Sequence, residues 1–68
     1  MESFAINLKK AREKEGLTQR ELATELNVSI NTYVTWEARG KNKRVPTMKV
    51  IAKIADILNI SLDELVGR

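Results

Sequence analysis

The 68-residue chain contains no cysteine and no histidine, only one proline, and only three aromatic residues. Without cysteine no disulfide bond can form, and without cysteine or histidine the usual zinc-binding patterns cannot be built. A chain of this length buries only about 60% of the surface that it exposes when unfolded, so its core is small. Its stability must therefore come from well-packed helices or from a partner subunit.

Several further features are missing, and each excludes a class of protein. No apolar run approaches the ~20 residues of a membrane-spanning helix, and residues 1–8 are too polar for a secretory signal. These absences predict a soluble, cytoplasmic protein with no membrane partner. No Ser-Lys pair or paired carboxylates stand out, because Asp63 and Glu64 are adjacent and diverge on a helix. We therefore expect no enzyme activity, metal, cofactor or small-molecule ligand.

The formal net charge of +3 is concentrated in one segment. Residues 1–26 and residues 45–68 are each neutral, so the whole excess lies in residues 27–44. The charged residues of that segment are Arg39, Lys41, Lys43 and Arg44 against Glu37. A local positive field attracts polyanions. A solvated loop has the same composition, so charge alone leaves binding to nucleic acid open.

The spacing of apolar residues is helical nearly throughout and predicts five short helices, an all-α fold and one domain over residues 1–68. Start and stop signals delimit these helices at Ser3, Gly16, Thr18 with Glu21, Ser29, Pro46 with Thr47, and Ser61 with Glu64. The third helix is expected to run to about Ala38, after a turn in which Asn27 tolerates a left-handed conformation. The best core candidates are Phe4, Leu8, Leu17, Leu22, Leu26, Val28, Tyr33, Ile51, Ile54 and Leu58.

The second and third expected helices are joined by only a few residues, which is the geometry of a helix-turn-helix. In that motif the second helix enters the DNA major groove, which is ~12 Å wide and is read through donors, acceptors and methyl groups. At 100° per residue, one side of the third helix carries Asn31, Thr32, Thr35 and Arg39. The other side carries Tyr33, Val34 and Glu37, with Ile30 nearby. The first group is the expected base-reading face, although a solvated polar face would show the same pattern.

Two stretches of the sequence also resemble a known family. LKKAREKEGLTQRELATELNVSINTYVTWE, residues 8–37, resembles the Cro and phage-repressor type of helix-turn-helix domain, also called the xenobiotic-response-element family. VPTMKVIAKIADILNISLDELV, residues 45–66, resembles the two closing helices of the same family. The resemblance implies a compact five-helix lambda-repressor-like DNA-binding domain with the helix-turn-helix at its second and third helices. It also implies a transcriptional regulator, a repressor of phage or bacterial type, that binds double-stranded DNA sequence-specifically as a dimer on a palindromic operator.

The resemblance also implies roles for individual residues. The implied base-reading residues are Ile30, Asn31, Thr32 and Thr35. Gln19 corresponds to a family glutamine that bonds phosphate and nearby bases. The other expected phosphate contacts are Ser29 and, from the cationic segment, Arg39, Lys41, Asn42, Lys43 and Arg44. Arg12 and Glu37 stand where the family forms a buried salt bridge between the first and third helices. That pair would account for an acid on the inner face of the third helix, because a buried carboxylate needs a partner and Arg can supply two hydrogen bonds.

The sequence departs from the family at two places. The stretch EARGKNKRVP is longer than the family's usual connection after the third helix, which leaves the phosphate contacts of that loop unassigned. Tyr33 occupies a core position where the family prefers isoleucine or valine, so its hydroxyl needs water or a partner. Ile30 lies near the inner edge by periodicity and at the DNA by resemblance. Trp36 can serve as a packing residue or contact phosphate through its N–H group.

The last helix carries more apolar residues than its own packing requires, and we expect a homodimer interface there. The expected interface residues are Ile60, Leu62, Leu65 and Val66. The rival interpretation is an antitoxin or protein-interaction adaptor that uses the same fold to hold a partner protein. A membrane-surface role for the fourth helix, with Lys49 and Lys53 opposite its apolar stripe, is a weaker alternative, because a small core requires the same stripe.

Overall fold

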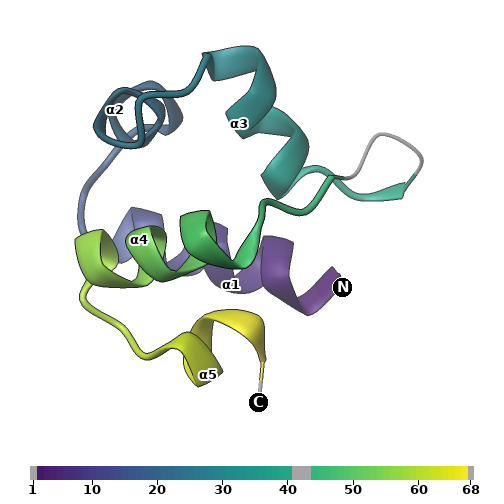
Figure 1. Ribbon diagram of the computed structural model, residues 1–68, viewed down its shortest axis with the longest axis vertical. Helices are drawn as coiled ribbons and strands as arrows, with labels where there is room; N and C mark the ends of the chain where they lie inside the picture. The colour runs from purple at the N-terminus through teal and green to yellow at the C-terminus, as the bar shows by residue number, and fades with distance from the viewer. Residues whose placement is uncertain (1, 41–43, 68) are drawn as a thin grey trace.

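The computed structural model describes residues 2–40 and 44–67, which form five helices and no strand (Figure 1). The helices are α1 (Glu2–Lys14), α2 (Gln19–Glu25), α3 (Ile30–Glu37), α4 (Met48–Leu58) and α5 (Leu62–Val66). The expected all-α architecture of five short helices is therefore confirmed. None of the helices in these residues is long and apolar enough to cross a membrane. The expected contacts of Lys41, Asn42 and Lys43 lie outside the described residues.

Side-chain caps begin the helices that follow α1. At α2 the capping box is complete, because Thr18 Oγ1 accepts from the backbone N–H of Glu21 at 3.0 Å while Glu21 Oε1 accepts from the backbone N–H of Thr18 at 2.8 Å. Ser29, Thr47 and Ser61 begin α3, α4 and α5 with one bond each, in which the side-chain oxygen accepts from the backbone N–H three residues further on. Each cap satisfies a backbone N–H that has no partner within its helix. Helix starts were thus largely readable from short-range sequence signals.

Two of the expected capping signals differ from the structure. Ser3 is not an N-cap, because α1 begins at Glu2 and already includes Ser3. At α5 only half of the expected capping box forms: Ser61 Oγ accepts from the backbone N–H of Glu64 at 3.0 Å, and within the described residues Glu64 returns no bond. A single side-chain acceptor is enough to begin a helix. The missing bond would have joined the backbone N–H of the capping residue to the Glu64 side chain, and water can satisfy that N–H instead.

The turn between α2 and α3 is short and tightly bonded. Asn27 adopts the expected left-handed conformation, with φ of 59°. The backbone N–H of Val28 then donates to the carbonyl of Ala23 at 3.0 Å, which is the pattern that closes a helix C-terminus. This turn fixes the direction in which α3 leaves α2.

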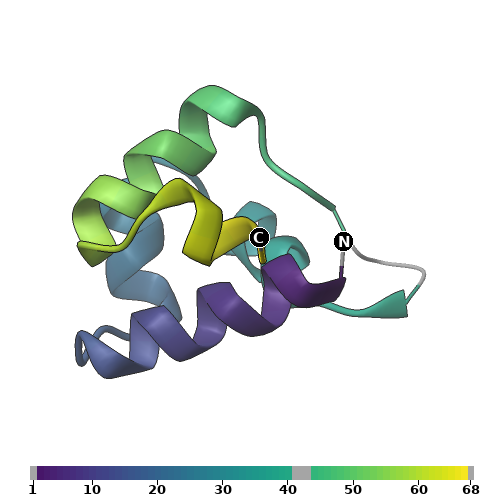
Figure 2. The same ribbon diagram turned by 90° about the horizontal axis from the view of Figure 1, so that it is seen from below.

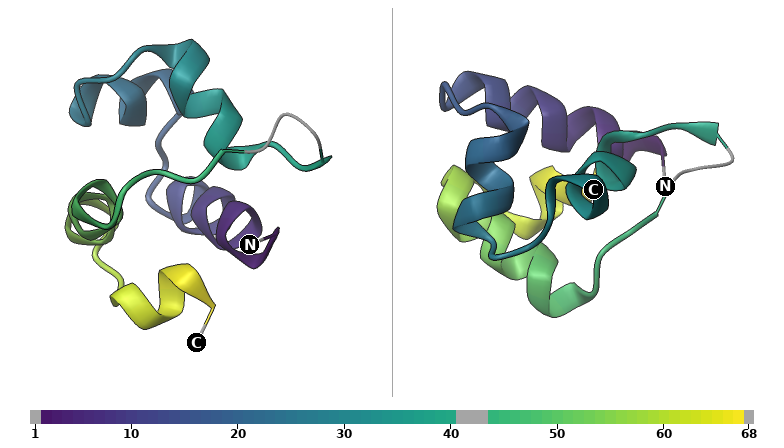
Figure 3. Two further views of the ribbon diagram at one scale, coloured as in Figure 1. Left: turned by 45° about the vertical axis from the view of Figure 1, so that its right-hand side comes forward. Right: turned by 90° about the horizontal axis from the view of Figure 1, so that it is seen from above.

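The helices are arranged around one hydrophobic core. Seen from below, α5 lies over the space between α1 and α4 (Figure 2), and it packs against both. The pair α2–α3 lies at the opposite end of the molecule from α5, with α1 and α4 between them (Figures 1 and 3). The buried core consists of Phe4, Leu8, Leu22, Ala23, Leu26, Tyr33, Trp36, Ile51, Ile54, Ala55, Leu58 and Leu65. Leu17 and Val28, expected in the core, are only partly buried at its edge.

The expectation that Leu65 forms part of a dimer surface is wrong. Its side chain is fully buried inside the protomer, so it belongs to the core and offers no area to a second copy. Ile60 and Val66 are partly buried against the same core, whereas Leu62 is 40% exposed. The sequence pattern alone could not separate these residues, because α5 has only five residues and too few turns to define a face. Leu62 is the apolar side chain that α5 leaves in water.

Leu65→Ala is expected to lower the free energy of unfolding by about 2–5 kcal/mol, because it removes buried methyl groups and leaves a cavity. Urea unfolding followed by circular dichroism measures the loss. Leu62→Ala is the matched control on the same helix and should cost far less, since its side chain is already partly in water. Equal losses for the two variants would contradict the assignment of Leu65 to the core.

Candidate nucleic-acid interface

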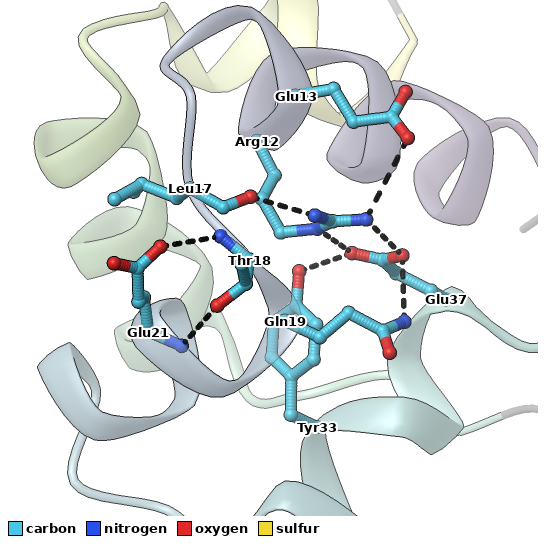
Figure 4. A network of polar contacts seen from close by, with 8 residues as sticks. All are labelled: Arg12, Glu13, Leu17, Thr18, Gln19, Glu21, Tyr33 and Glu37. Atoms are coloured by element: carbon cyan, nitrogen blue, oxygen red, sulfur yellow. Dashed lines mark hydrogen bonds and ion pairs between the residues drawn. The ribbon is translucent and has the colours of Figure 1, made fainter.

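The Glu37 carboxylate, at the end of α3, receives hydrogen bonds from side chains of three helices (Figure 4). Arg12 in α1 donates through Nε to Oε2 at 2.7 Å and through Nη2 to Oε1 at 3.2 Å. Gln19, the first residue of α2, donates through Nε2 to Oε1 at 3.0 Å. Tyr33, one turn earlier in α3, donates its hydroxyl to Oε2. Glu37 therefore joins the first three helices at one point.

Arg12 is as deeply enclosed as its partner. The side chain of Arg12 is 9% exposed and that of Glu37 is 5% exposed. Besides its two bonds to Glu37, Arg12 donates through Nη1 to the backbone carbonyl of Leu17 at 2.7 Å, just before α2 begins. No buried side-chain N or O atom in the described residues lacks a hydrogen-bond partner. The ion pair is therefore fully compensated, which is the condition under which burial of two charges is tolerated.

The network shifts the pKa values of its members in the directions that keep both charges. Burial alone would raise the pKa of Glu37, but hydrogen bonds from Arg12, Tyr33 and Gln19 outweigh that effect and lower it. The hydrogen bond to Glu37 raises the pKa of Arg12. Burial and the bond to Glu37 raise the pKa of Tyr33, so its hydroxyl stays a donor. The network is thus a carboxylate held by an arginine, an amide and a phenol.

Tyr33 and Trp36 anchor α3 to the rest of the molecule. Their rings meet edge to face, with centroids 5.7 Å apart and planes at 64°, a favourable arrangement for aromatic pairs. Tyr33 is fully buried and Trp36 is 6% exposed. The structure therefore places the ring of Trp36 in the core, as the packing interpretation expects. The hydroxyl of Tyr33, which the sequence left without a partner, ends on Glu37.

The outer face of α3 carries small side chains in water. Asn31 and Thr32 are exposed, Thr35 is half-buried, and Ile30 is half-buried against the core. Val34 was expected on the inner face, but the structure shows it 42% exposed. The reason is that Trp36 packs into the core beside Tyr33. The helix is therefore rotated so that Val34 lies on the same exposed side as Asn31, called here the outer arc of α3. Sequence analysis missed Val34 as a surface residue, and the size of Trp36 was the available signal.

The residues expected at phosphate lie in different environments. Arg39 is exposed and makes no hydrogen bond or ion pair with the described residues. Ser29 uses its Oγ to cap α3, accepting from the backbone N–H of Thr32 at 3.1 Å. Gln19 has one amide N–H directed to Glu37, as described above. The backbone N–H of Arg44 donates to the carbonyl of Thr35 at 3.0 Å, which brings the chain after the loop back to the end of α3.

Comparisons with known proteins support one family. A family model described as helix-turn-helix matches residues 8–65. The phage CTXphi transcriptional repressor RstR of Vibrio cholerae is 43% identical over 51 residues, which is 75% of this chain and 43% of RstR. The helix-turn-helix transcriptional regulator ImmR of Bacillus subtilis is 35% identical over 66 residues, which is 97% of this chain and 50% of ImmR. An uncharacterised regulator of the same organism, YqaE, is 37% identical over 62 residues, which is 91% of this chain and 51% of YqaE.

The chain spans about half the length of the curated relatives that it matches. No solved structure matches it. The family model covers α2, α3 and the ion-pair network, because its match begins at residue 8 and ends at residue 65.

Glu37→Gln is expected to destabilise the fold by about 3–5 kcal/mol, because it leaves the Arg12 guanidinium buried without a counter-charge. The pKa of Glu37 is lowered in the folded state, so its stabilising contribution is complete above the unfolded-state pKa of about 4.3 and is lost as the pH falls through the lower folded-state pKa. Urea unfolding between pH 2 and 7 (roughly the span over which carboxylates titrate) measures both effects.

Glu25→Gln is the control, since Glu25 is an exposed carboxylate on the neighbouring helix. It should leave the free energy of unfolding at neutral pH nearly unchanged and keep the acid-induced loss of the parent. If Glu37→Gln kept that loss undiminished, Glu37 would not be its source.

Proposed function

The chain belongs to the Cro and phage-repressor type of helix-turn-helix family, and we propose that it regulates transcription by binding double-stranded DNA sequence-specifically, as a repressor of phage or bacterial type. In this proposal α3 lies in the major groove and residues 1–68 act as one DNA-binding domain. The relatives named as transcriptional regulators support the choice of ligand and process.

One observation carries this proposal. The inner side of α3 is fixed by Tyr33, Trp36 and Glu37, while its outer side presents an arc of small, exposed side chains. A helix that is to read base edges has to be rigid, and it has to fit a groove about 12 Å wide without long side chains in the way. The structure meets the first demand with a buried network to α1 and α2. It meets the demand for short side chains with the amide of Asn31, the hydroxyls of Thr32 and Thr35, and the side chain of Val34.

Charge supports the same assignment. Arg39 stands two residues after the end of α3 and is exposed, so we place it beside the proposed base-reading face, within reach of a phosphate. Phosphate contacts position a protein on DNA and make its affinity depend on salt, whereas contacts to base edges carry the sequence preference. We assign Asn31 to the second role and Arg39 to the first.

We further propose that two copies bind a palindromic site, with half-sites one helical turn apart. Leu62 on α5 supports a dimer contact at that end, because it is a large apolar side chain with 40% of its surface in water. α5 lies at the opposite end of the molecule from α2 and α3 (Figure 1), so a contact through Leu62 would leave the face of α3 uncovered.

Selection of bound duplexes from a random DNA library tests the function directly, with the affinity of the selected duplex then followed against salt concentration. A palindromic consensus and a steep salt dependence are expected. Weak binding without a consensus would overturn the proposal. It would favour the alternative of an adaptor or antitoxin that holds a protein partner.

Asn31→Ala should weaken binding to the consensus by about 1–3 kcal/mol and leave binding to random DNA nearly unchanged, because it removes a base contact. Arg39→Ala should weaken both by a similar factor and lower the salt slope by about 1. Fluorescence anisotropy with both duplexes at several salt concentrations measures the two effects. Equal losses of specific and random binding in both variants would contradict the division of roles.

Leu62→Asp is expected to shift the association equilibrium toward monomer while the fold is kept, since the side chain is already partly exposed. Sedimentation equilibrium with and without the palindromic duplex measures the shift. Glu25→Asp serves as the control, because that conservative change lies on α2, at the other end of the molecule. An unchanged association constant for Leu62→Asp would exclude α5 as the dimer contact.

A further inference from the structure

The hydroxyl group of Thr35 is already committed within α3. Its Oγ1 donates to the backbone carbonyl of Thr32 at 2.6 Å, which is a short and well-formed hydrogen bond. A threonine hydroxyl has one proton, so that proton is not available to a base. The methyl group is the part of the Thr35 side chain that is not turned to the helix backbone by this bond. Thr35, which is half-buried, therefore has no hydroxyl donor left for a base, and its methyl group and oxygen lone pairs are the groups that remain.

Thr32 belongs to a second local arrangement. Its backbone N–H donates to Ser29 Oγ, and Ser29 Oγ in turn donates to Thr32 Oγ1 at 2.9 Å. These bonds fix both side chains at the start of α3. At 100° per residue Thr32 lies 60° from Thr35 and 100° from Asn31, so it borders the outer arc on the side toward Trp36.

Asn31 and Thr35, four residues apart, lie at the centre of the outer arc of α3. Val34, three residues after Asn31, lies at the edge of the arc opposite Thr32. Asn31 is exposed, and its amide makes no hydrogen bond to the described residues. Val34 adds an isopropyl group with 42% exposure. The arc thus consists of one uncommitted amide and two methyl-bearing side chains. This combination depends on Val34 facing outward, as the structure shows.

We infer that α3 reads an A·T-rich half-site, in which the Asn31 amide pairs with an adenine and the methyl groups of Val34 and Thr35 contact thymine C5-methyl groups on neighbouring base pairs. This inference rests on the proposed function and names the class of DNA that the same site takes. An asparagine amide matches the N6 donor and N7 acceptor of adenine, and aliphatic groups match the thymine methyl.

The spacing and the chemistry both agree with this choice. α3 rises 1.5 Å per residue, so Asn31 and Thr35 are about 6 Å apart along the helix, close to two base-pair steps of 3.4 Å. Guanine offers two acceptors, N7 and O6, in the major groove. A valine cannot donate to them, and the Thr35 hydroxyl could do so only by giving up its bond to the Thr32 carbonyl. G·C pairs are therefore disfavoured opposite these two side chains.

Deoxyuridine substitution tests the inference. In the duplex selected from the random library, each thymine of the half-site is replaced singly by deoxyuridine, which lacks the C5-methyl group and keeps the hydrogen-bonding edge. We expect about a fourfold loss of affinity at each contacted thymine, which is the value of burying one methyl group. Replacements outside the half-site serve as the control and should change nothing.

Matched variants assign the contacts to side chains. Thr35→Ser keeps the hydroxyl and removes the methyl, so it should abolish the deoxyuridine effect at one thymine. Thr35→Val keeps a methyl and removes the hydroxyl, so it should bind the consensus as the parent does. Val34→Ala should abolish the effect at a different thymine. Thermal unfolding of the three variants, all at surface or half-buried positions, shows whether each one keeps the fold.

The outcomes separate the inference from the function on which it rests. A consensus with G·C pairs at the central half-site positions, or one that is insensitive to deoxyuridine, would overturn the A·T-rich readout and leave sequence-specific binding in place. Loss of preference in Thr35→Val with retention in Thr35→Ser would also overturn it, because the hydroxyl would then be the group that reads the base. Absence of any consensus would overturn both.

Discussion

The side chain of Glu37 is only 5% exposed, and the arrangement of the first three helices depends on how its carboxylate charge is compensated. A charge in such a place is tolerated only when hydrogen bonds replace its lost water. Here the replacement comes from α1, from the start of α2 and from α3 itself, through Arg12, Gln19 and Tyr33. Because one acceptor serves all three helices, a shift of any one of them would break a hydrogen bond to a carboxylate whose side chain is largely withdrawn from water.

This constraint explains how so small a domain holds a rigid reading surface. The hydrophobic core is thin, and apolar contacts are not directional, so they leave helices free to slide and rotate. The bonds around Glu37 are directional and fix the rotation of α3 about its own axis. The edge-to-face contact of Tyr33 with Trp36 fixes the same rotation from the neighbouring side. The outer arc of α3 follows as a consequence of how its inner side is held.

The sequence predicted those features that depend on local signals. The capping box at Thr18 and the left-handed Asn27 follow from short-range chemistry, and the structure has both. The features that sequence analysis missed depend on the competition of side chains for a common core. Val34 was placed inside by periodicity, but Trp36 is larger and takes the buried arc. Leu65 was placed at the surface because α5 is too short to define a face. In the structure α5 packs against α1 and α4, and the Leu65 side chain is buried there.

The separation between the two sides of α3 has a consequence for how such regulators diverge. The α3 residues of the Glu37 network, Tyr33 and Glu37, lie on the inner side of the helix. Asn31, Val34 and Thr35 lie on its outer side and make no side-chain bond to that network. Substitutions on the outer arc are therefore expected to spare the fold, because the residues that hold α3 in place differ from those that we propose to read DNA. With α3 as the proposed reading helix, a lineage with this architecture can change the DNA that it recognises in single mutational steps, each passing through a folded intermediate.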